Sequence, residues 1–301
     1  MATEDSIALP GRVVRVTNLE RVLWPEAGFT KGDMLRYYKA VSSFMLPHIR
    51  DRAMVLSRHP SGVEGDWWFQ TQCPHPPPWV RTIPIPKATD PDAHFEYCVI
   101  DNVASLLWAA NLSAIEFHPL LSRTASLGQP TSLVLDLDPG PRVGFDGCAR
   151  VALSIGEHLA GRGLNSYAKT TGSTGIHIHV PLNTSTNFDE AKAFARDVAR
   201  ATTAAHPALV TDRTSRKERM SKVLVDWAQN NPLRSVVAPY SLRALPFPSV
   251  ATPVTWTEIE KAAVGRGESL VLHPEDILKR VDAVGDPLDQ VQTERQALPS
   301  L

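Results

Sequence analysis

The sequence predicts a soluble α/β (α+β) protein in which strands and helices alternate. Apolar runs of strand length, such as residues 132–137 and 222–228, alternate with runs of helical period, such as residues 148–163 and 189–205. The 301 residues are 43% hydrophobic and 21% charged, which excludes a disordered or fibrous chain. We find neither an internal repeat nor a low-complexity segment.

The N-terminal elements begin with a helix. Thr30 is suited to cap it, because apolar and aromatic side chains follow at helical spacing from Met34 to Phe44. The next elements that we predict are a strand at 53–58, a proline-rich loop at 74–86, short strands near 95–100 and a buried helix near 102–111.

The C-terminal elements are a strand at 132–137, an amphipathic helix at 148–163, and a strand, glycine-rich turn and strand over residues 166–182. A second helix at 189–205 and a strand at 222–228 follow.

The three cysteines are expected to be unpaired structural residues. Cys73, Cys98 and Cys148 are an odd number without a C-x-x-C pair, which argues against a disulfide framework and against a zinc ribbon. Cys73 and His75 offer two metal ligands, but the proline-rich segment shows no second pair.

The N-terminal residues bear on the cellular location of the protein, and the distribution of charge bears on its binding partners. The N-terminal decapeptide is acidic and lacks an apolar core, which predicts a cytoplasmic protein without membrane association. The net charge is −1, yet residues 11–52 hold eight basic against four acidic residues, and residues 211–222 hold five against two. Residues 256–301 hold nine acidic against five basic residues. This segregation permits a basic groove for nucleic acid, although solvated helix faces explain it as well.

Three carboxylates follow apolar runs. Asp136 and Asp138 end "SLVLDLDPG" two residues apart, so they project from one face of the predicted strand, roughly 7 Å apart. Asp226 ends the apolar run "VLVD". Carboxylates suit Mg²⁺ or Mn²⁺, and three can hold two ions about 3.5–4 Å apart for in-line phosphoryl transfer. The alternative is two solvated aspartates before a Pro-Gly turn.

The segment "KTTGSTGIHIHV" predicts a glycine-rich turn between two strands. The backbone N–H groups of such a turn can bind phosphate oxygens, and Thr171, Ser173 and Thr174 add hydroxyl donors. His177 and His179 share one face of the second strand, and a protonated His177 could donate to a phosphate. An ordinary hairpin also requires glycines, so both interpretations stay open.

Three successive aromatic residues, Trp67, Trp68 and Phe69, precede the proline-rich segment. Neighbouring side chains of a strand point to opposite faces, so at least one of the three is expected to be exposed rather than part of the core. Exposed aromatics beside basic residues are suited to stacking on bases, at about 1–3 kcal/mol per base.

These motifs, in this order, resemble the polymerase domain of bacterial ligase D, in the archaeo-eukaryotic primase superfamily. That family shows a strand ending in D-x-D, a turn and strand of the S-x-G-x-H type, and a strand ending in Asp. The matching segments here are "LVLDLDPG", "TGSTGIHIHV" and "VLVDWAQN", and the likeness extends to "TNLERVLWPEAGFTKGDMLRYY", "DWWFQ", "IEFHPL" and "PYSLRA". It implies a primase-like catalytic fold, with central mixed or antiparallel sheets flanked by helices.

The resemblance also implies a domain plan and a role for each matching residue. Residues 1–301 would form a single catalytic domain, with a 5′-phosphate pocket and aromatic loop before about residue 130 and the metal-binding motifs after it. The metal ligands and catalytic residues would be Asp136, Asp138 and Asp226. The nucleotide would be held by His118, Thr171, Ser173, Thr174, His177 and Arg243. DNA would be bound by Asn18, Arg21, Lys31, Trp68, Phe69 and Arg219, the first three at a 5′-phosphate and the last near the primer terminus.

The implied activity is that of a DNA-dependent primase-polymerase, a nucleotidyltransferase that uses two Mn²⁺ or Mg²⁺ ions. It would add nucleotides, with ribonucleotides preferred, to primer termini at gaps and double-strand-break ends during non-homologous end joining. The expected partners are gapped or broken DNA with a 5′-phosphate, NTP or dNTP and, by analogy, a Ku-type end binder and a separate DNA ligase. We expect a bacterial cytoplasmic monomer, associated with the nucleoid when it is on DNA.

Three positions depart from the pattern of many relatives. Thr174 and Thr71 stand where lysine is common, which removes a cation near the triphosphate and another near DNA. Arg21 also stands where lysine is common, and it binds phosphate as a fork rather than as a point charge.

Two other functions compete with this one. A haloacid-dehalogenase-type phosphatase also begins with a strand ending in D-x-D, but that fold requires a later Asp-Asp pair, which this sequence lacks. A non-catalytic DNA-end-binding module is the second alternative, and the intact set of three aspartates argues against it.

Overall fold

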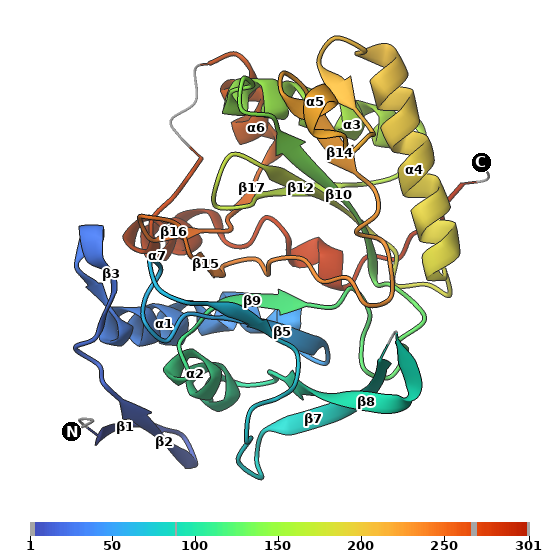
Figure 1. Cartoon of the computed structure of the whole chain (residues 1–301). Coiled ribbons are helices and arrows are strands. Elements are labelled where there is room, and N and C mark those ends of the chain that lie inside the picture. Colours follow the sequence, from blue (N-terminus) through green and yellow to red (C-terminus); the bar gives the residue numbers. More distant parts are fainter. Residues whose placement is uncertain (1–3, 88, 266–269, 300–301) are drawn as a thin grey trace. The chain divides into compact units, whose positions relative to one another are not determined.

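The computed structural model describes residues 4–87, 89–265 and 270–299 and confirms the mixed α/β class (Figure 1). The chain divides into two compact units. Unit 1 comprises Met1–Leu120, Ser235–Val250 and His273–Val281, and unit 2 comprises Leu121–Arg234, Ala251–Leu272 and Asp282–Leu301. The single catalytic domain that we expect over 1–301 stays a prediction. Arg266 and Glu268, two of the charges counted near the C-terminus, lie outside the described residues.

Unit 1 is built on a five-stranded sheet in the order β6-β5-β8-β7, with β9 also paired to β5. Three two-stranded ribbons, β1-β2, β3-β4 and β15-β16, accompany it. Its strands are β1 (Glu4–Leu9), β2 (Arg12–Thr17), β3 (Val22–Trp24), β4 (Phe29–Thr30), β5 (Ala53–Arg58), β6 (Trp68–Gln70), β7 (Arg81–Lys87), β8 (Asp90–Val99), β9 (Ala114–Pro119), β15 (Leu242–Arg243) and β16 (Ser249–Val250). Its helices are η1 (Pro25–Ala27), α1 (Lys31–Ile49), α2 (Val103–Asn111) and most of α7 (Pro274–Val284).

Helix α1 begins as the sequence predicts. Thr30 is the N-cap, and a capping box joins it to Asp33, because each side chain accepts from the backbone N–H of the other residue. The apolar face of α1 packs on the sheet, where the ring of Tyr38 meets Phe117 of β9 edge-on at 5.0 Å. Helix α2 likewise confirms the buried helix expected near 102–111.

Two expectations for unit 1 are wrong. The proline-rich segment is not a loop throughout, because residues Arg81–Lys87 form β7. Prolines are tolerated there since β7 is the edge strand of the sheet. Cys73 and Cys98 form a disulfide although they are 25 residues apart without a recognisable motif. The backbone N–H of Cys73 donates to Glu96, which brings that segment alongside β8.

Unit 2 is built on a six-stranded sheet in the order β13-β14-β10-β12-β11-β17. All neighbours are antiparallel except β13 and β14. The strands are β10 (Ser132–Pro139), β11 (Tyr167–Thr170), β12 (Ile176–Pro181), β13 (Val210–Thr211), β14 (Val223–Asp226) and β17 (Pro253–Val254). The helices are α3 (Phe145–Gly161), α4 (Phe188–Ala205), α5 (Arg216–Arg219), α6 (Trp256–Ala263) and η2 (Asp289–Gln292).

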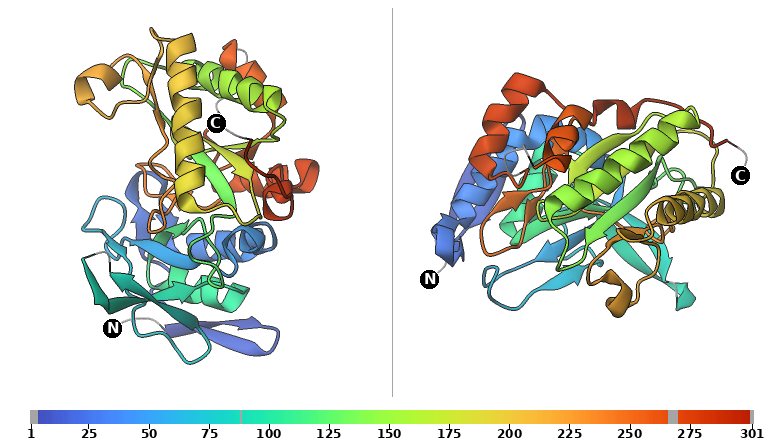
Figure 2. Two further views of the ribbon diagram at one scale, coloured as in Figure 1. Left: turned by 90° about the vertical axis from the view of Figure 1, so that its right-hand side faces the viewer. Right: turned by 90° about the horizontal axis from the view of Figure 1, so that it is seen from above.

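One face of this sheet forms the core of unit 2. Apolar residues of β10, β12 and β14 pack there against α3, α4 and α6, and Figures 1 and 2 show α3 and α4 lying along the sheet. The expected helices and strands between residues 132 and 228 are therefore confirmed, with ends that differ by a few residues. Across the described parts of both units, no helix has the length and apolar character that crossing a bilayer requires.

Candidate active site

A row of polar side chains crosses the sheet of unit 2. Asp136 on β10 lies directly opposite Asp226 on β14 and directly opposite His177 on β12. Cross-strand partners on one face of an antiparallel pair have Cβ atoms roughly 4.5–5.5 Å apart, so these side chains are neighbours. Asp138 projects from the same face two residues along β10. The structure thus places the three predicted aspartates together.

Strand alternation separates this row from the core. Leu135 and Leu137 on β10 are fully buried in the core cluster under the helices. Asp136 points to the opposite face, where its side chain is 14% exposed, and Asp138 lies at the strand end, where its side chain is 45% exposed. The two carboxylates therefore sit at the boundary between the protein interior and solvent, where a ligand can reach them.

The negative charges of Asp226 and Asp136 repel each other, so each makes ionisation of the other less favourable. Burial raises the pKa of Asp226, and the charge of Asp136 raises it further, although a hydrogen bond from the backbone N–H of Ala228 opposes the shift. Gln229 Nε2 lies 3.3 Å from Asp226 Oδ2 and 3.5 Å from Asp136 Oδ2, so its amide group donates to both. A pair of carboxylates in this situation is stabilised by an added positive charge.

A histidine and an arginine lie beside the other carboxylate oxygens. His177 Nε2 lies 3.2 Å from Asp136 Oδ1, and a guanidinium nitrogen of Arg219 lies 3.4 Å from Asp138 Oδ2. Arg219, which we expect to contact DNA near a primer terminus, is thus placed beside an expected metal ligand. A DNA phosphate or a metal ion that approaches Asp138 would therefore come close to the ion pair of Arg219 and Asp138.

Lys169 is a member of the row that the sequence analysis missed. On β11 it lies directly opposite His177, so the row continues as Asp226, Asp136, His177 and Lys169 across four strands. The Lys169 side chain is fully buried. In the sequence, the only indication of its role was its position just before the glycine-rich turn. Its burial could not be predicted, because it depends on strands that are distant in the sequence.

The glycine-rich turn between β11 and β12 packs against β10. The backbone N–H of Thr171 donates to the Gly175 carbonyl at 2.9 Å and closes the turn. A Cβ atom on Gly175 would lie 2.8 Å from the Leu137 carbonyl oxygen, so only glycine permits this close approach to the strand between Asp136 and Asp138.

The predicted phosphate-binding hydroxyls differ in exposure along this turn. Thr171 is buried, Ser173 is half-buried and Thr174 is exposed. Ser173 and Thr174 are therefore accessible to a phosphate from solvent.

The residues of the row suit a divalent metal ion by their chemistry. Carboxylate oxygens are the ligands that Mg²⁺ and Mn²⁺ prefer. Burial and the charge of Asp136 raise the pKa of Asp226, so a bound cation would favour its charged form. Within the described residues, no three His, Cys, Asp or Glu side chains form a preassembled metal-binding cluster. Asp136, Asp138 and Asp226 would therefore have to turn toward an ion as it binds.

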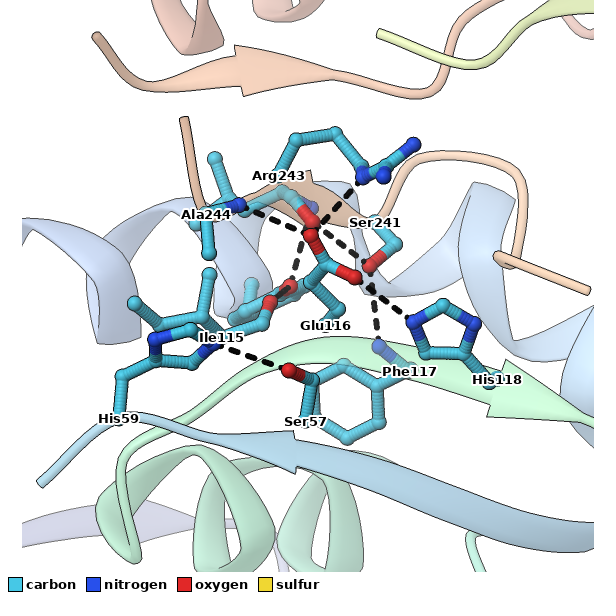
Figure 3. Close-up of polar contacts among 11 residues, drawn as sticks. Ser57, His59, Ile115, Glu116, Phe117, His118, Ser241, Arg243 and Ala244 are labelled. Atoms are coloured by element: carbon cyan, nitrogen blue, oxygen red, sulfur yellow. Dashed lines mark hydrogen bonds and ion pairs between the residues drawn. The ribbon is translucent and has the colours of Figure 1, made fainter. Parts of the chain in front are cut away.

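A second polar group lies in unit 1, around a buried carboxylate. His118 on β9 and Arg243 on β15, both predicted to hold a nucleotide, each contact Glu116 (Figure 3). Glu116 Oε2 lies 2.8 Å from His118 Nε2, and Glu116 Oε1 lies 2.9 Å from Arg243 Nε. Glu116 was not predicted from the sequence, although its position two residues before His118 places both on one face of β9.

The residues predicted to bind a 5′-phosphate lie together in unit 1. Asn18 has a positive φ of 55° and its carbonyl accepts from the backbone N–H of Arg21, whose own carbonyl accepts from Lys31. The Lys31 side chain is 3% exposed, and its Nζ donates to the Thr17 carbonyl at 2.7 Å. Burial, together with the charge of Arg21, lowers the pKa of Lys31 to about 8. Lys31 is thus not an ordinary solvated cation.

The three successive aromatic residues are all exposed. Trp67, Trp68 and Phe69 are 53%, 41% and 54% exposed, which confirms that the group is not part of the core. The guanidinium of Arg58 lies 5.2 Å from the ring centre of Trp68. An aromatic surface beside a cation is suited to stacking on nucleic-acid bases.

The site in unit 2 defines a class of protein. Strands that end in aspartates, beside a glycine-rich turn with accessible hydroxyls, have the chemistry needed for metal-assisted transfer of a phosphorus-containing group. The chain belongs to the LigD primase-polymerase domain family, whose model matches residues 30–288.

Relatives and a solved structure agree with this assignment. The "Multifunctional non-homologous end joining protein LigD" of Mycobacterium bovis is 34% identical over 290 residues, which cover 93% of this chain and 37% of that protein. The "Bifunctional non-homologous end joining protein LigD" of Bacillus subtilis is 29% identical over 251 residues, which cover 83% of this chain and 40% of that protein. The "Polymerase Domain from Mycobacterium tuberculosis Ligase D in complex with DNA" superposes with a TM-score of 0.85 at 33% identity, covering 93% of this chain and 98% of the other.

The family assignment confirms the expected fold and the expected class of enzyme, a primase-polymerase. It removes the support for a haloacid-dehalogenase-type phosphatase. The chain spans 37% of the length of the Mycobacterium bovis relative, so the substrates and partners of the longer proteins are not assigned to it by similarity alone.

Proposed function

We propose that this protein is a nucleotidyltransferase that extends primer termini at DNA gaps and double-strand-break ends, and that it prefers ribonucleotides. The observation that carries this proposal is the row of Asp226 and Asp136 with Asp138 beside it, on a face of the sheet that solvent reaches. Carboxylates placed close together repel each other, and their value lies in binding a cation where the reaction takes place.

Asp136, Asp138 and Asp226 are proposed to hold two Mg²⁺ or Mn²⁺ ions. When bound, such ions supply activation of the attacking hydroxyl and stabilisation of the leaving oxygen. Gln229, which donates to two of the carboxylates, holds their orientation before an ion arrives. His177 lies against Asp136, with 3.2 Å between Nε2 and Oδ1.

The nucleotide is proposed to be NTP or dNTP, and six residues are proposed to contact it: His118, Thr171, Ser173, Thr174, His177 and Arg243. The accessible hydroxyls of the turn and the guanidinium of Arg243 are donors suited to phosphate oxygens. Thr174 in place of a lysine predicts a weaker hold on the triphosphate than in relatives that carry the cation.

DNA is proposed to be bound at three positions. Asn18, Arg21 and Lys31 take a 5′-phosphate, Trp68 and Phe69 stack on bases, and Arg219 contacts DNA near the primer terminus. The similar Mycobacterium tuberculosis polymerase domain was solved in complex with DNA, which supports a DNA partner here. We further propose that the protein is a monomer in the bacterial cytoplasm, associated with the nucleoid when it is on DNA. Its proposed protein partners are a Ku-type end binder and a separate DNA ligase.

Extension of a labelled primer on a gapped duplex with Mn²⁺ tests the proposal. The parent protein should extend the primer and should show a higher kcat/KM with NTP than with dNTP. Asp136→Ala and Asp226→Ala should each abolish extension while DNA affinity stays within about twofold, because only transition-state stabilisation is lost. More than a few per cent of the parent rate in either variant would contradict the assignment of the metal ligands.

The DNA-end-binding alternative predicts the opposite result. A non-catalytic module would bind the gapped duplex but would extend no primer with any nucleotide or metal. The same titrations and the same extension assay therefore separate the two functions.

A further inference from the structure

Glu116 uses both oxygens of a buried carboxylate. Its side chain is 9% exposed, and Oε1 accepts from Arg243 Nε and from the backbone N–H of Ala244, each at 2.9 Å. Oε2 lies 2.8 Å from His118 Nε2. Figure 3 shows the carboxylate between these groups, with Arg243 and Ala244 on one side and His118 on the other.

The backbone around this carboxylate is held by independent hydrogen bonds. The hydroxyl of Ser241 accepts from the backbone N–H of Phe117 at 3.1 Å, and the backbone N–H of Ala238 donates to the Phe117 carbonyl at 2.8 Å. The hydroxyl of Tyr38 donates to the Ile115 carbonyl and accepts from the backbone N–H of Leu242 at 3.0 Å. Strand β9 and the segment around β15 are therefore joined without Glu116, so Glu116 is not needed to connect them.

The charge state of Glu116 determines how its partners bind. Burial raises the pKa of Glu116, but the hydrogen bond from His118 and the charge of Arg243 lower it more, so the pKa falls to about 2. The carboxylate is therefore ionised at neutral pH and can only accept hydrogen bonds. His118 must then carry its hydrogen on Nε2 where it meets Glu116, which turns the Nδ1 side of the ring away from the carboxylate.

The imidazole ring of His118 also contacts Phe69, one of the exposed aromatic residues. The rings of Phe69 and His118 meet edge to face, 5.4 Å apart and at 88°. Ser57 on β5 lies opposite Glu116 on β9 and opposite Phe69 on β6, so one face of the sheet carries these side chains in a row. A ring of His118 that is fixed by Glu116 gives Phe69 a fixed surface to lie against.

We infer that Glu116 is a positioning residue, which holds the guanidinium of Arg243, the imidazole of His118 and, through His118, the ring of Phe69 in the orientations that bind a nucleotide and a base. The inference rests on the proposed roles of His118 and Arg243. A contact through Nε fixes the plane of a guanidinium, and two contacts on one rigid carboxylate fix Arg243 and His118 relative to each other. Buried ion pairs add little to stability compared with apolar residues, so orientation is the better explanation of this one.

The test separates orientation from stability by means of two matched variants. Glu116→Gln keeps the shape of the side chain but removes the charge. Asp101→Asn removes a carboxylate with the same kind of partners, since Asp101 accepts from Arg81 Nε and from the backbone N–H of Asp51, each at 2.8 Å, away from His118 and Arg243. Primer extension at varied NTP concentration and thermal unfolding are measured for both variants.

Glu116→Gln is expected to raise the KM for NTP about tenfold or more, with kcat changed less than threefold, because misoriented binding groups weaken the nucleotide contact before chemistry. Asp101→Asn should leave KM and kcat within twofold of the parent. A purely structural role for Glu116 would instead lower the unfolding temperature and the apparent kcat at an unchanged KM, and that outcome would overturn the inference.

Two further measurements keep the inference separate from the proposed function and from misfolding. If His118→Ala and Arg243→Ala leave the KM for NTP unchanged, the proposed nucleotide contacts are wrong and the inference falls with them. If they raise it and a folded Glu116→Gln does not, the inference alone is wrong. In the parent protein, ¹⁵N NMR should show a hydrogen on Nε2 of His118, and an Nε2 without a hydrogen would overturn the inference even if Glu116→Gln does not fold.

Discussion

Raising the pH from 7 to 9 should remove most of the proposed preference of this protein for DNA that carries a 5′-phosphate, because Lys31 loses its proton in this interval. Lys31 has an ordinary pKa of 10.5, which burial and then the nearby charge of Arg21 lower to about 8. With that value, about 90% of the unbound protein carries the charge at pH 7 and about 10% at pH 9. If only the charged form binds the phosphate, apparent affinity falls by the same ratio, about tenfold.

The assay compares two gapped duplexes that differ only in a 5′-phosphate or a 5′-hydroxyl. Fluorescence anisotropy at fixed salt gives the ratio of the two dissociation constants at pH 7 and at pH 9. Using the ratio cancels the contribution of other DNA contacts, and the phosphate itself stays a dianion because its second pKa is about 6. The 5′-phosphate preference should fall about tenfold between the two pH values.

Two variants test whether Lys31 is the titrating group. Lys31→Met should lose the 5′-phosphate preference at both pH values, since no charge remains to titrate. Arg21→Ala removes a charge that lowers the pKa of Lys31, so the loss of preference should begin at higher pH, although the preference itself is smaller. An unchanged preference in the parent between pH 7 and pH 9 would refute the reasoning, because a buried lysine of this pKa could not then contact the phosphate.

Gly140→Ala should reduce primer extension at least tenfold, because a Cβ atom there would lie 1.6 Å from the carbonyl oxygen of Arg219 and would displace that segment; an unchanged rate would show that the segment is adaptable. Loss of the disulfide in Cys73→Ser should lower the free energy of unfolding by about 3 kcal/mol in urea titrations under oxidising conditions, and equal stability would argue that the bond does not form. Thr174→Lys should lower the KM for NTP several-fold by adding a cation beside the exposed turn, whereas a higher KM would place the triphosphate elsewhere.

Local patterns were sufficient to predict the main strands and helices of unit 2 between residues 132 and 228. The apolar alternation that ends in Asp136 and Asp138 is a property of one strand, and the amphipathic runs of α3 and α4 are properties of single helices. Each pattern is contained in a single segment of the chain, so no knowledge of the partner elements was needed. The capping of α1 by Thr30 is local in the same way.

Features that depend on strand register could not be predicted. Lys169 becomes part of the row only because β11 pairs with β12 in a register that sets it opposite His177. A one-residue shift would turn its side chain to the other face of the sheet. The disulfide between Cys73 and Cys98 also depends on which strands become neighbours. The same is true of β7, the proline-containing strand at the edge of its sheet.

The same dependence explains why Glu116 was overlooked while His118 and Arg243 were not. A family motif draws attention to residues that contact a substrate, whereas a buried carboxylate is recognised only when the groups around it are known. Glu116 and Lys169 both have ionisable side chains that are nearly or fully buried. Lys169 lies opposite His177, and Glu116 contacts His118 and Arg243, all of which the sequence had singled out. Removing a charge from water is costly and gives little stability in return even when the charge is paired. Charged residues at such positions are therefore better explained by the orientation of neighbouring groups than by folding, and Glu116→Gln measures this directly.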